Sequence, residues 1–331
     1  MSSALIPYNE SSAIIPFGFN NLGATCYFNA VLQSLLSCTS FIEELLQKDT
    51  RDRYNKNPIA KLIIELIETA IYYEDLSQKK INDDPSIIAD IAETTAKLNN
   101  YSPRIWRQMI TNLCNVKKIP IESFMQGQQC AGEGYNYLLE SMEELNIIQN
   151  LFMHRYKSLI RCFTCDKWVS NVECIYNLFD VEPNLQSAQI EQFQKYHIPT
   201  TNMNDFLAKQ TGYVDKDFIC PECKESGEKY KMNVLVMVPE ILVVMSKKYN
   251  VEQKLDVYTE FPERMVFKGN NDMIYEAVAQ IEHAGGRHGG HYWAICKRKN
   301  GWFDINDGTV TPSTFRPTKN TYIVFYHLAK S

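Results

Sequence analysis

The sequence predicts an α+β fold in which a mostly helical first half packs against an antiparallel sheet from the second half. Apolar residues recur at helical spacing up to about residue 155, and β-rich runs separated by turn signals dominate after it. With 331 residues, of which 45% are hydrophobic, the chain can bury a substantial core. This change of pattern along the chain indicates helices first and a sheet second.

The helical half begins in the segment FNNLGATCYFNAVLQSLL, residues 19–36. Its apolar positions 28, 31, 32, 35 and 36 fall on one face of a helix that starts near Cys26. A second helix follows Asn57, a predicted N-cap, and has Pro58 in its first turn. Further helices are expected at residues 85–98, 103–114 and 128–145.

The second half contains the predicted strands. Two β-rich runs interrupted by Pro239 lie in KMNVLVMVPEILVVMSKKY, and three more strands are expected in EAVAQIEHAGG, HYWAICKR and TYIVFYH. Tight turns are predicted at Asn300-Gly301 and Asp307-Gly308. Short connections of this kind join neighbouring antiparallel strands.

Composition limits the possible partners and compartment. The net charge of −5 and the lack of a basic stripe argue against a zinc-ribbon protein that binds nucleic acid, and against an anionic membrane as partner. No apolar stretch approaches the length of a membrane span, and the N-terminus lacks the pattern of a signal peptide. We therefore expect a soluble, non-secreted protein of the cytoplasm, with a nuclear location also compatible.

The ten cysteines include two Cys-x-x-Cys pairs, CFTC (Cys162, Cys165) and CPEC (Cys220, Cys223). Four thiolates suit tetrahedral Zn²⁺, and each spacer lets one tight turn present two sulfur atoms. We expect one structural Zn²⁺ per chain, with the long intervening segment folding out and back. The alternative is two unrelated redox or core pairs, although neither has a thioredoxin-like setting.

Cys26 is a candidate nucleophile because a helix N-terminus stabilises a thiolate. Asn21, in the turn before it, could direct its amide at a developing oxyanion. The alternative is that Cys26 is a small buried apolar residue, which is how we interpret Cys38, Cys114, Cys174 and Cys296.

A nucleophilic thiol also needs a base, and the segment EHAGGRHGGHYWAIC provides three histidines among glycines. His291 stands at the start of a strand, and Asn306 and Asp307 end the next one, so the short turn between the strands brings them together. His154, His197 and His327 are interpreted as structural, with His154 in a helix. The order Cys, His, Asn is that of papain-like cysteine peptidases.

These motifs resemble those of the ubiquitin-specific proteases, a family of deubiquitinases. GFNNLGATCYFNAVLQSL is similar to the family's Cys box, and HAGGRHGGHYWAI with WFDINDGTV and TYIVFYH to its His box. QQCAGEGYNYLLE resembles its Gln-Gln-Asp helix, CFTC and CPEC its zinc knuckles, and VPEILVVMSKKY the strand pair that follows them. The resemblance runs in order from about Gly18 to Tyr326.

The resemblance implies a papain-like cysteine peptidase with a helical thumb, an antiparallel palm and zinc-tipped fingers. After a flexible lead-in at residues 1–16, a single catalytic domain would occupy 17–331. Within it the thumb would span about 17–155, the fingers with part of the palm about 156–250, and the palm with the His box about 251–331.

The resemblance also implies hydrolysis of the (iso)peptide bond after the C-terminal Gly-Gly of ubiquitin through a thioester. Cys26 would be the nucleophile, His291 the general base, and Asn306 the residue that orients it. Asp307 would support the histidine, and Asn21 would contribute to the oxyanion hole. The ubiquitin tail would contact Glu133, Tyr292, Gln128, and His283 and His288 in a flexible covering loop. The expected partners are ubiquitin and ubiquitinated proteins, bound by a monomer.

The sequence departs from the family pattern at three places. Cys130 replaces the acid of the Gln-Gln-Asp helix, which removes one acidic contact to the tail. Phe19 replaces a leucine, and Lys247-Lys248-Tyr249 stands where the family has Lys-Arg-Phe. Two alternatives therefore remain: a protease for another modifier that ends in Gly-Gly, and a catalytically weak ubiquitin-binding pseudoenzyme.

Overall fold

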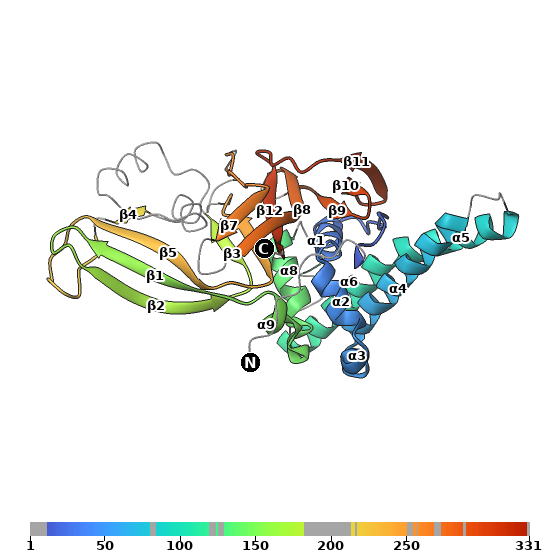
Figure 1. Ribbon diagram of the computed structural model, residues 1–331, viewed down its shortest axis with the longest axis horizontal. Coiled ribbons are helices and arrows are strands. Elements are labelled where there is room, and N and C mark those ends of the chain that lie inside the picture. Colours follow the sequence, from blue (N-terminus) through green and yellow to red (C-terminus); the bar gives the residue numbers. More distant parts are fainter. Residues whose placement is uncertain are drawn as a thin grey trace.

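The computed structural model describes residues 12–79, 84–118, 124, 129–181, 213–215, 217–249, 254–255, 257–267, 273–286 and 289–329. Within these residues a body of helices packs against an eight-stranded sheet, and a four-stranded sheet projects away from both (Figure 1). The predicted α+β class is confirmed, and the three parts correspond to thumb, palm and fingers. In the described part of the chain, no helix is both long and apolar enough to cross a membrane.

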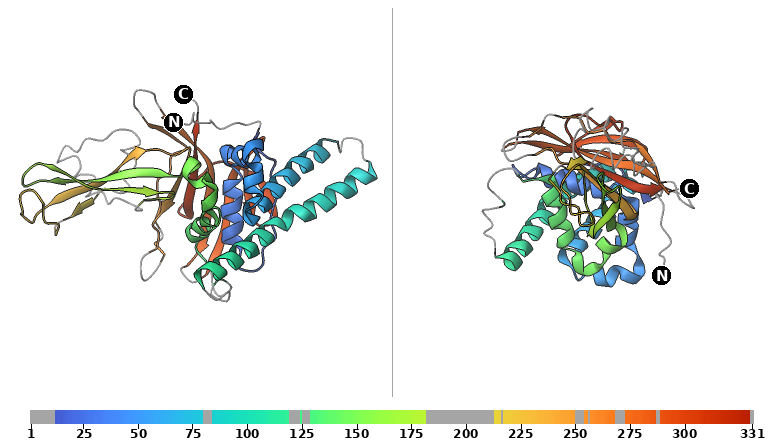
Figure 2. Two further views of the ribbon diagram at one scale, coloured as in Figure 1. Left: turned by 90° about the horizontal axis from the view of Figure 1, so that it is seen from below. Right: turned by 90° about the vertical axis from the view of Figure 1, so that its left-hand side faces the viewer.

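The thumb is built from the N-terminal helices. They are α1 (Cys26–Leu35), α2 (Thr39–Leu46), α3 (Lys48–Tyr54), α4 (Pro58–Lys79), α5 (Pro85–Asn99), α6 (Tyr101–Lys117), α8 (Ala131–Glu140), the 3-10 turn η3 (Glu143–Leu145) and α9 (Ile147–Leu151). Asn57 caps α4 as predicted, since its side chain accepts from the backbone N–H groups of Ile59 and Ala60. Helices α4 and α5 extend from the molecule on the side opposite the fingers (Figures 1 and 2).

Helix α1 lies at the centre of the molecule, between the sheet and helices α6 and α8. The sequence pattern predicts one buried face, but every residue from Cys26 to Leu35 is buried. Its polar side chains are therefore paired inside the core: Gln33, for example, donates to the carbonyl of Phe17 and accepts from Arg298. Residues on all sides fix the position of this helix.

The palm sheet has the strand order β11-β10-β9-β8-β12-β6-β3, and β7 pairs with β8. Its strands are β3 (Phe179–Val181), β6 (Ile241–Ser246), β7 (Arg264–Phe267), β8 (Met273–Gly285), β9 (Gly290–Arg298), β10 (Gly301–Asn306), β11 (Thr309–Ser313) and β12 (Thr321–Ala329). Successive hairpins join β8 to β11, with the predicted turns at Asn300-Gly301 and Asp307-Gly308. The β3–β6 pair is parallel, an exception to the predicted antiparallel sheet.

The fingers consist of β1 (His154–Cys162), β2 (Trp168–Tyr176), β4 (Tyr213–Asp215) and β5 (Lys229–Met237), paired in the order β2-β1-β5-β4. The prediction of a helix around His154 is wrong, because this residue begins β1 and its ring packs near Tyr156 and Phe179. The predicted lead-in falls mostly on residues outside the described ranges. In its described part, Ile14 is buried and its carbonyl accepts from the N–H of Lys299.

Candidate active site

Cys26 is the first residue of α1, and its side chain is buried against β9. The backbone N–H of Tyr292, the residue that follows His291, acts on the thiol and tends to lower its pKa. Burial raises the pKa of Cys26, the Tyr292 N–H opposes that shift, and the carboxylate of Asp307 adds to it. The pKa therefore stays above the ordinary value for a thiol, and the nucleophile needs a base.

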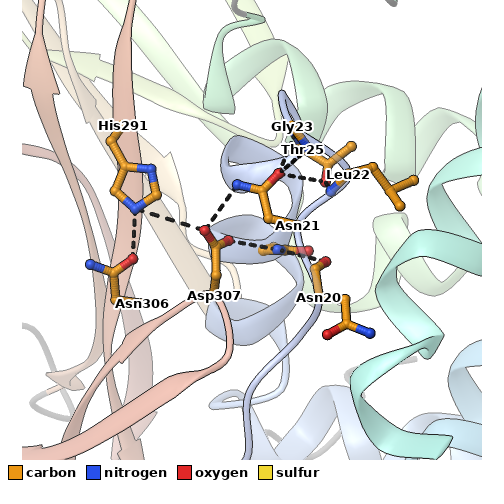
Figure 3. Close-up of polar contacts among 9 residues, drawn as sticks. Asn20, Asn21, Leu22, Gly23, Thr25, His291, Asn306 and Asp307 are labelled. Carbon is orange, nitrogen blue, oxygen red and sulfur yellow. Dashed lines mark hydrogen bonds and ion pairs between the residues drawn. The ribbon is translucent and has the colours of Figure 1, made fainter. Parts of the chain in front are cut away.

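His291 is the second residue of β9, and its side chain is 40% exposed. The atom Nε2 lies 2.6 Å from Oδ1 of Asn306, the last residue of the neighbouring strand β10 (Figure 3). Since a carbonyl oxygen only accepts, Nε2 carries the hydrogen of the neutral ring. The other ring nitrogen, Nδ1, is then the basic one.

Asp307 lies farther from the histidine than the sequence suggests. Its Oδ2 is 3.9 Å from Nε2 of His291 but only 2.9 Å from Nδ2 of Asn21 (Figure 3). Its Oδ1 is 2.7 Å from Nδ2 of Asn29. The residue occupies the left-handed region, with φ of 49°, in the Asp-Gly turn between β10 and β11. Its carboxylate is thus directed mainly at two asparagines of the segment around Cys26.

Asn21 is held at both ends of its amide. Its Oδ1 accepts from the backbone N–H groups of Gly23 at 2.9 Å and Thr25 at 3.2 Å, which shapes the turn before α1. Its Nδ2 donates to Asp307, and the side chain is exposed. An amide nitrogen carries two hydrogens, so the bond to Asp307 leaves one for another acceptor.

The chain before Cys26 lies directly on the Asp307-Gly308 turn. The N–H of Phe19 donates to the carbonyl of Asp307 at 2.8 Å. A Cβ atom on Gly18 would come within 2.6 Å of the Cα of Gly308, so only glycine permits this approach. This contact brings the segment that bears Asn21 and Cys26 to the end of the strand that bears Asn306.

Tyr292 belongs to a buried aromatic cluster, which we define as Tyr249, His283, Tyr292 and Tyr322. The rings of His283 and Tyr292 are 4.2 Å apart, and the hydroxyl of Tyr249 lies 2.7 Å from Nδ1 of His283. The expectation that His283 lies in a flexible loop is wrong, because β8 extends to Gly285 and pairs His283 with Tyr292. Glycine content suggested a loop, but the glycines at 285 and 290 are themselves a strand pair.

The remaining residues predicted to bind the tail are only partly described. Cys130 precedes α8 as its N-cap, and its sulfur lies 3.0 Å from the hydroxyl of Tyr322 in the aromatic cluster. Glu133 is exposed in the first turn of the same helix. Gln128 and His288 lie outside the described residues.

Cys162, Cys165, Cys220 and Cys223 converge at the end of the fingers, with their sulfur atoms within 4.8 Å of one another. The distances are 3.8 Å from Cys162 to Cys223 and 3.9 Å from Cys165 to Cys220. A tetrahedral ion with zinc–sulfur bonds of about 2.3 Å places sulfur atoms about 3.8 Å apart. The four cysteines can therefore hold one metal ion.

Each Cys-x-x-Cys pair forms a tight turn. The backbone N–H of Cys162 donates to the carbonyl of Lys167, and the backbone N–H of Cys220 donates to the carbonyl of Glu225. Within these turns Asp166 and Lys224 adopt positive φ. Burial acts to raise the pKa of Cys162, but the N–H groups of Cys165 and Thr164 outweigh it and lower the pKa to about 6. The turn therefore favours the thiolate form that binds metals.

Sequence reasoning missed two polar residues near the site, Asn29 and Ser102. Asn29 is buried on α1, three residues after Cys26, and bonds to Asp307 and to the hydroxyl of Ser102 on α6. The sequence offered one signal for Asn29: an amide side chain stands three residues after the candidate nucleophile, between the apolar residues Phe28 and Ala30. On a helix, residues three apart lie on the same face.

A buried thiol at the start of a helix that packs on the strand of a histidine, with that histidine held by an asparagine of the next strand, is the arrangement of papain-like cysteine hydrolases. Residues 17–326 match the family described as Ubiquitin carboxyl-terminal hydrolase, and the chain belongs to that family. It is a cysteine-type deubiquitinating enzyme, as the sequence motifs predict.

Individual relatives agree with this assignment. The chain is 23% identical to Ubiquitin carboxyl-terminal hydrolase 12 of Salmo salar, over 98% of this chain and 92% of the relative. It is 24% identical to Ubiquitin carboxyl-terminal hydrolase 4 of Arabidopsis thaliana, over 89% of this chain and 84% of the relative. Among solved structures, the SAGA DUB module Ubp8/Sgf11/Sus1/Sgf73 bound to monoubiquitin matches with a TM-score of 0.66 and 18% identity, over 99% of this chain and 72% of that chain. The same module bound to ubiquitin aldehyde gives the same values.

Proposed function

We propose that Cys26 is the nucleophile, His291 the general base, and Asn306 the residue that orients the base. The observation that carries this proposal is the arrangement on β9. His291 is held through Nε2 by Asn306 at 2.6 Å, and the N–H of the next residue, Tyr292, acts on the thiol of Cys26 and favours its thiolate form. This arrangement supports a base and a nucleophile that lie near each other at the start of β9.

The proposed reaction begins when Nδ1 of His291 takes the proton of Cys26. The thiolate attacks the carbonyl carbon of the last glycine, and the carbonyl oxygen becomes negatively charged. The second N–H of the Asn21 amide and the N–H of Cys26 stabilise that oxyanion. The imidazolium then protonates the departing lysine amine, and water hydrolyses the thioester with His291 again as base.

Ubiquitin is the substrate we propose. Support comes from the names of the related hydrolases and from matched structures whose titles describe bound monoubiquitin or ubiquitin aldehyde. Tyr292, Glu133, Gln128, His283 and His288 stay as predicted contacts to its tail. A second candidate is another modifier ending in Gly-Gly, favoured by the neutral Cys130 where the family pattern has an acid.

For the metal we propose one structural Zn²⁺ per chain, held by Cys162, Cys165, Cys220 and Cys223. The sulfur spacing and the paired tight turns support zinc. With four protein ligands the ion would have no open position, so its role would be to join the ends of the finger strands. The residues that transfer protons would then all lie in the thumb and the palm.

We also propose that the enzyme is a cytoplasmic protein, with a nuclear location also compatible, on the basis of its composition, and that it acts as a monomer. The matched structures are assemblies of several chains, so the monomer should be tested by sedimentation of the purified protein. The division into thumb, fingers and palm at about residues 155 and 250 is likewise proposed.

Turnover of ubiquitin carrying a C-terminal fluorogenic amide tests the proposed function. We expect activity in the wild type, and losses of at least about 1,000-fold for Cys26→Ala and His291→Ala, because nucleophile and base act as one unit. The same amides of other Gly-Gly modifiers should be assayed in parallel. Higher kcat/KM on one of them would favour the second candidate, and no turnover of any would contradict an active protease.

A further inference from the structure

We propose that Asn29 is a positioning residue, which orients the oxyanion-binding amide of Asn21 through the carboxylate of Asp307. This inference rests on the proposed function, because it concerns the same acyl transfer. It gives the interior of α1 a role beyond carrying the nucleophile. It also gives Asp307 a main partner other than the histidine.

Asn29 is fixed on both sides of its amide and is only 3% exposed. Its Nδ2 donates to Oδ1 of Asp307 at 2.7 Å and to the carbonyl of Asn20 at 3.2 Å. Its Oδ1 accepts from the hydroxyl of Ser102, a fully buried residue of α6. A buried amide with all of these contacts has one orientation.

The contact at Asp307 transmits that orientation to the site. One carboxylate oxygen bonds to Asn29. The other bonds to Nδ2 of Asn21 at 2.9 Å (Figure 3). The other bonds of the Asn21 side chain, from the N–H groups of Gly23 and Thr25 and from the hydroxyl of Thr25, all reach Oδ1. The direction of the Asn21 N–H groups therefore depends on Asp307, and the direction of Asp307 depends on Asn29.

The chemical consequence is specific to acyl transfer. Without Asn29 the carboxylate of Asp307 loses its buried donor and can rotate, and the exposed Asn21 amide, still held at Oδ1, loses the fixed acceptor of its Nδ2. Removing an oxyanion donor outright costs about 10²–10³-fold in kcat, so disordering one should cost about 10–100-fold. Substrate binding before bond formation does not use this donor, so KM should change little.

The test compares Asn29→Ala and Ser102→Ala with Asn57→Ala. Asn57 is a matched control, since it is another buried asparagine of the thumb, and its side-chain partners, Ser141, Glu144, Ile59 and Ala60, are not residues of the site. We expect kcat on the ubiquitin amide to fall about 10–100-fold for Asn29→Ala, by less for Ser102→Ala, and by under about 3-fold for Asn57→Ala. Alkylation of Cys26 by iodoacetamide forms no oxyanion, so its rate should change by under about 3-fold in all three.

A double substitution covers the case in which Asn29→Ala fails to fold. In Asn29→Asp alone, two carboxylates face each other and repel. In Asp307→Asn alone, two amide groups face each other and the charged acceptor is lost. Together they exchange donor and acceptor across one contact, so kcat should recover about 10-fold or more over Asn29→Asp.

Three results would overturn the inference. The first is a kcat for Asn29→Ala that matches Asn57→Ala while the wild type is active, together with no recovery in the double variant. The second is an equal loss in alkylation and turnover, which would indicate a displaced thiol. The third is an inactive wild type, which would refute the proposed function and the inference together.

Discussion

Asp307 acts in two different ways at the scale of single residues. Its charge raises the pKa of the Cys26 thiol, and its oxygen atoms hold the amides of Asn21 and Asn29. The first effect disfavours the thiolate, while the second organises the group that would bind the oxyanion. The two effects can be separated by reagents that react with the thiol without forming an oxyanion.

Replacing the charge of Asp307 should therefore shift the pH dependence of thiol alkylation. Because the carboxylate raises the pKa of Cys26, Asp307→Asn should lower that pKa and move the midpoint of the alkylation rate to lower pH. Peptide mass spectrometry of Cys26 after iodoacetamide treatment measures this rate. Asp304→Asn, on the strand that precedes the turn of Asp307, is the control, and it should leave the midpoint in place. An unchanged or higher midpoint for Asp307→Asn would contradict the assigned cause.

Residue types together with their positions in the sequence were sufficient to select Cys26, His291 and Asn306 as candidates. The pairing of β9 with β10 explains why His291 and Asn306 lie side by side. Residues that act through others, such as Asn29, carry no such signal, because a single buried amide on a helix is compatible with many roles. The environment of His283 was also beyond prediction, since it depends on how far β8 continues before the turn.

Helix α8 provides a prediction at the scale of elements. Cys130 is its N-cap, a position where a carboxylate is a far better acceptor than a sulfur atom. Cys130→Asp should stabilise the protein by about 1 kcal/mol in urea unfolding relative to Cys130→Ala. It should also lower KM for ubiquitin by about 3–10-fold if the acid meets an arginine of the tail. An unchanged KM would show that this contact does not contribute here.

The fingers provide the second prediction, on metal content. Metal analysis of the purified protein should find about one Zn²⁺ per chain, as expected for four thiolate ligands. Cys165→Ser should lose the ion and lower the thermal midpoint, whereas Cys174→Ser, on β2 outside the cluster, should keep it. A wild-type protein that folds fully without metal would contradict this interpretation.

Some helices and strands are easier to predict from the sequence than others. The palm strands β6, β8 and β12 were predicted because their apolar runs are mostly buried, and β9 because apolar residues fill its buried centre. Strand β1 was missed because its hydrophobicity does not follow its burial: Ser158 is buried and Leu159 is half-buried. The predicted helix at 128–145 is shorter in the structure: α8 ends at Glu140, and a 3-10 turn follows.

At the scale of the whole molecule, the reacting groups come from two layers, the helices of the thumb and the sheet of the palm. Cys26 belongs to the central helix of the thumb, whereas His291, Asn306 and Asp307 belong to the palm sheet (Figures 1 and 3). The main core joins these layers through residues such as Leu32 and Leu35 of α1 and Ile281 of β8. The geometry of the site therefore depends on packing between thumb and palm.

Buried histidines make the stability of the whole fold sensitive to acid. Burial lowers the pKa of His154 and of His327 to about 4, from 6.5. Between these values the unfolded chain binds protons that the folded protein does not bind, so the free energy of unfolding falls as pH falls from about 6.5 to about 4. Each histidine should contribute on the order of 1 kcal/mol per pH unit.

Urea unfolding across this pH range measures the effect. His327→Gln should reduce the pH slope by about one proton. Ser40→Ala removes the hydrogen bond to Nε2 of His327 but keeps the titrating ring, so it should lower stability with the slope retained. Equal slopes in His327→Gln and the wild type would contradict the role of this histidine.

Covalent capture of the nucleophile is the most direct measurement of the central claim. Ubiquitin carrying an electrophile at its C-terminus should form one adduct with the wild-type chain, which peptide mass spectrometry assigns to Cys26. The adduct should be lost in Cys26→Ala and retained in Cys38→Ala, whose thiol is buried in the core. Labelling that persists in Cys26→Ala, or that is absent from the wild type, would contradict Cys26 as the nucleophile of a ubiquitin hydrolase.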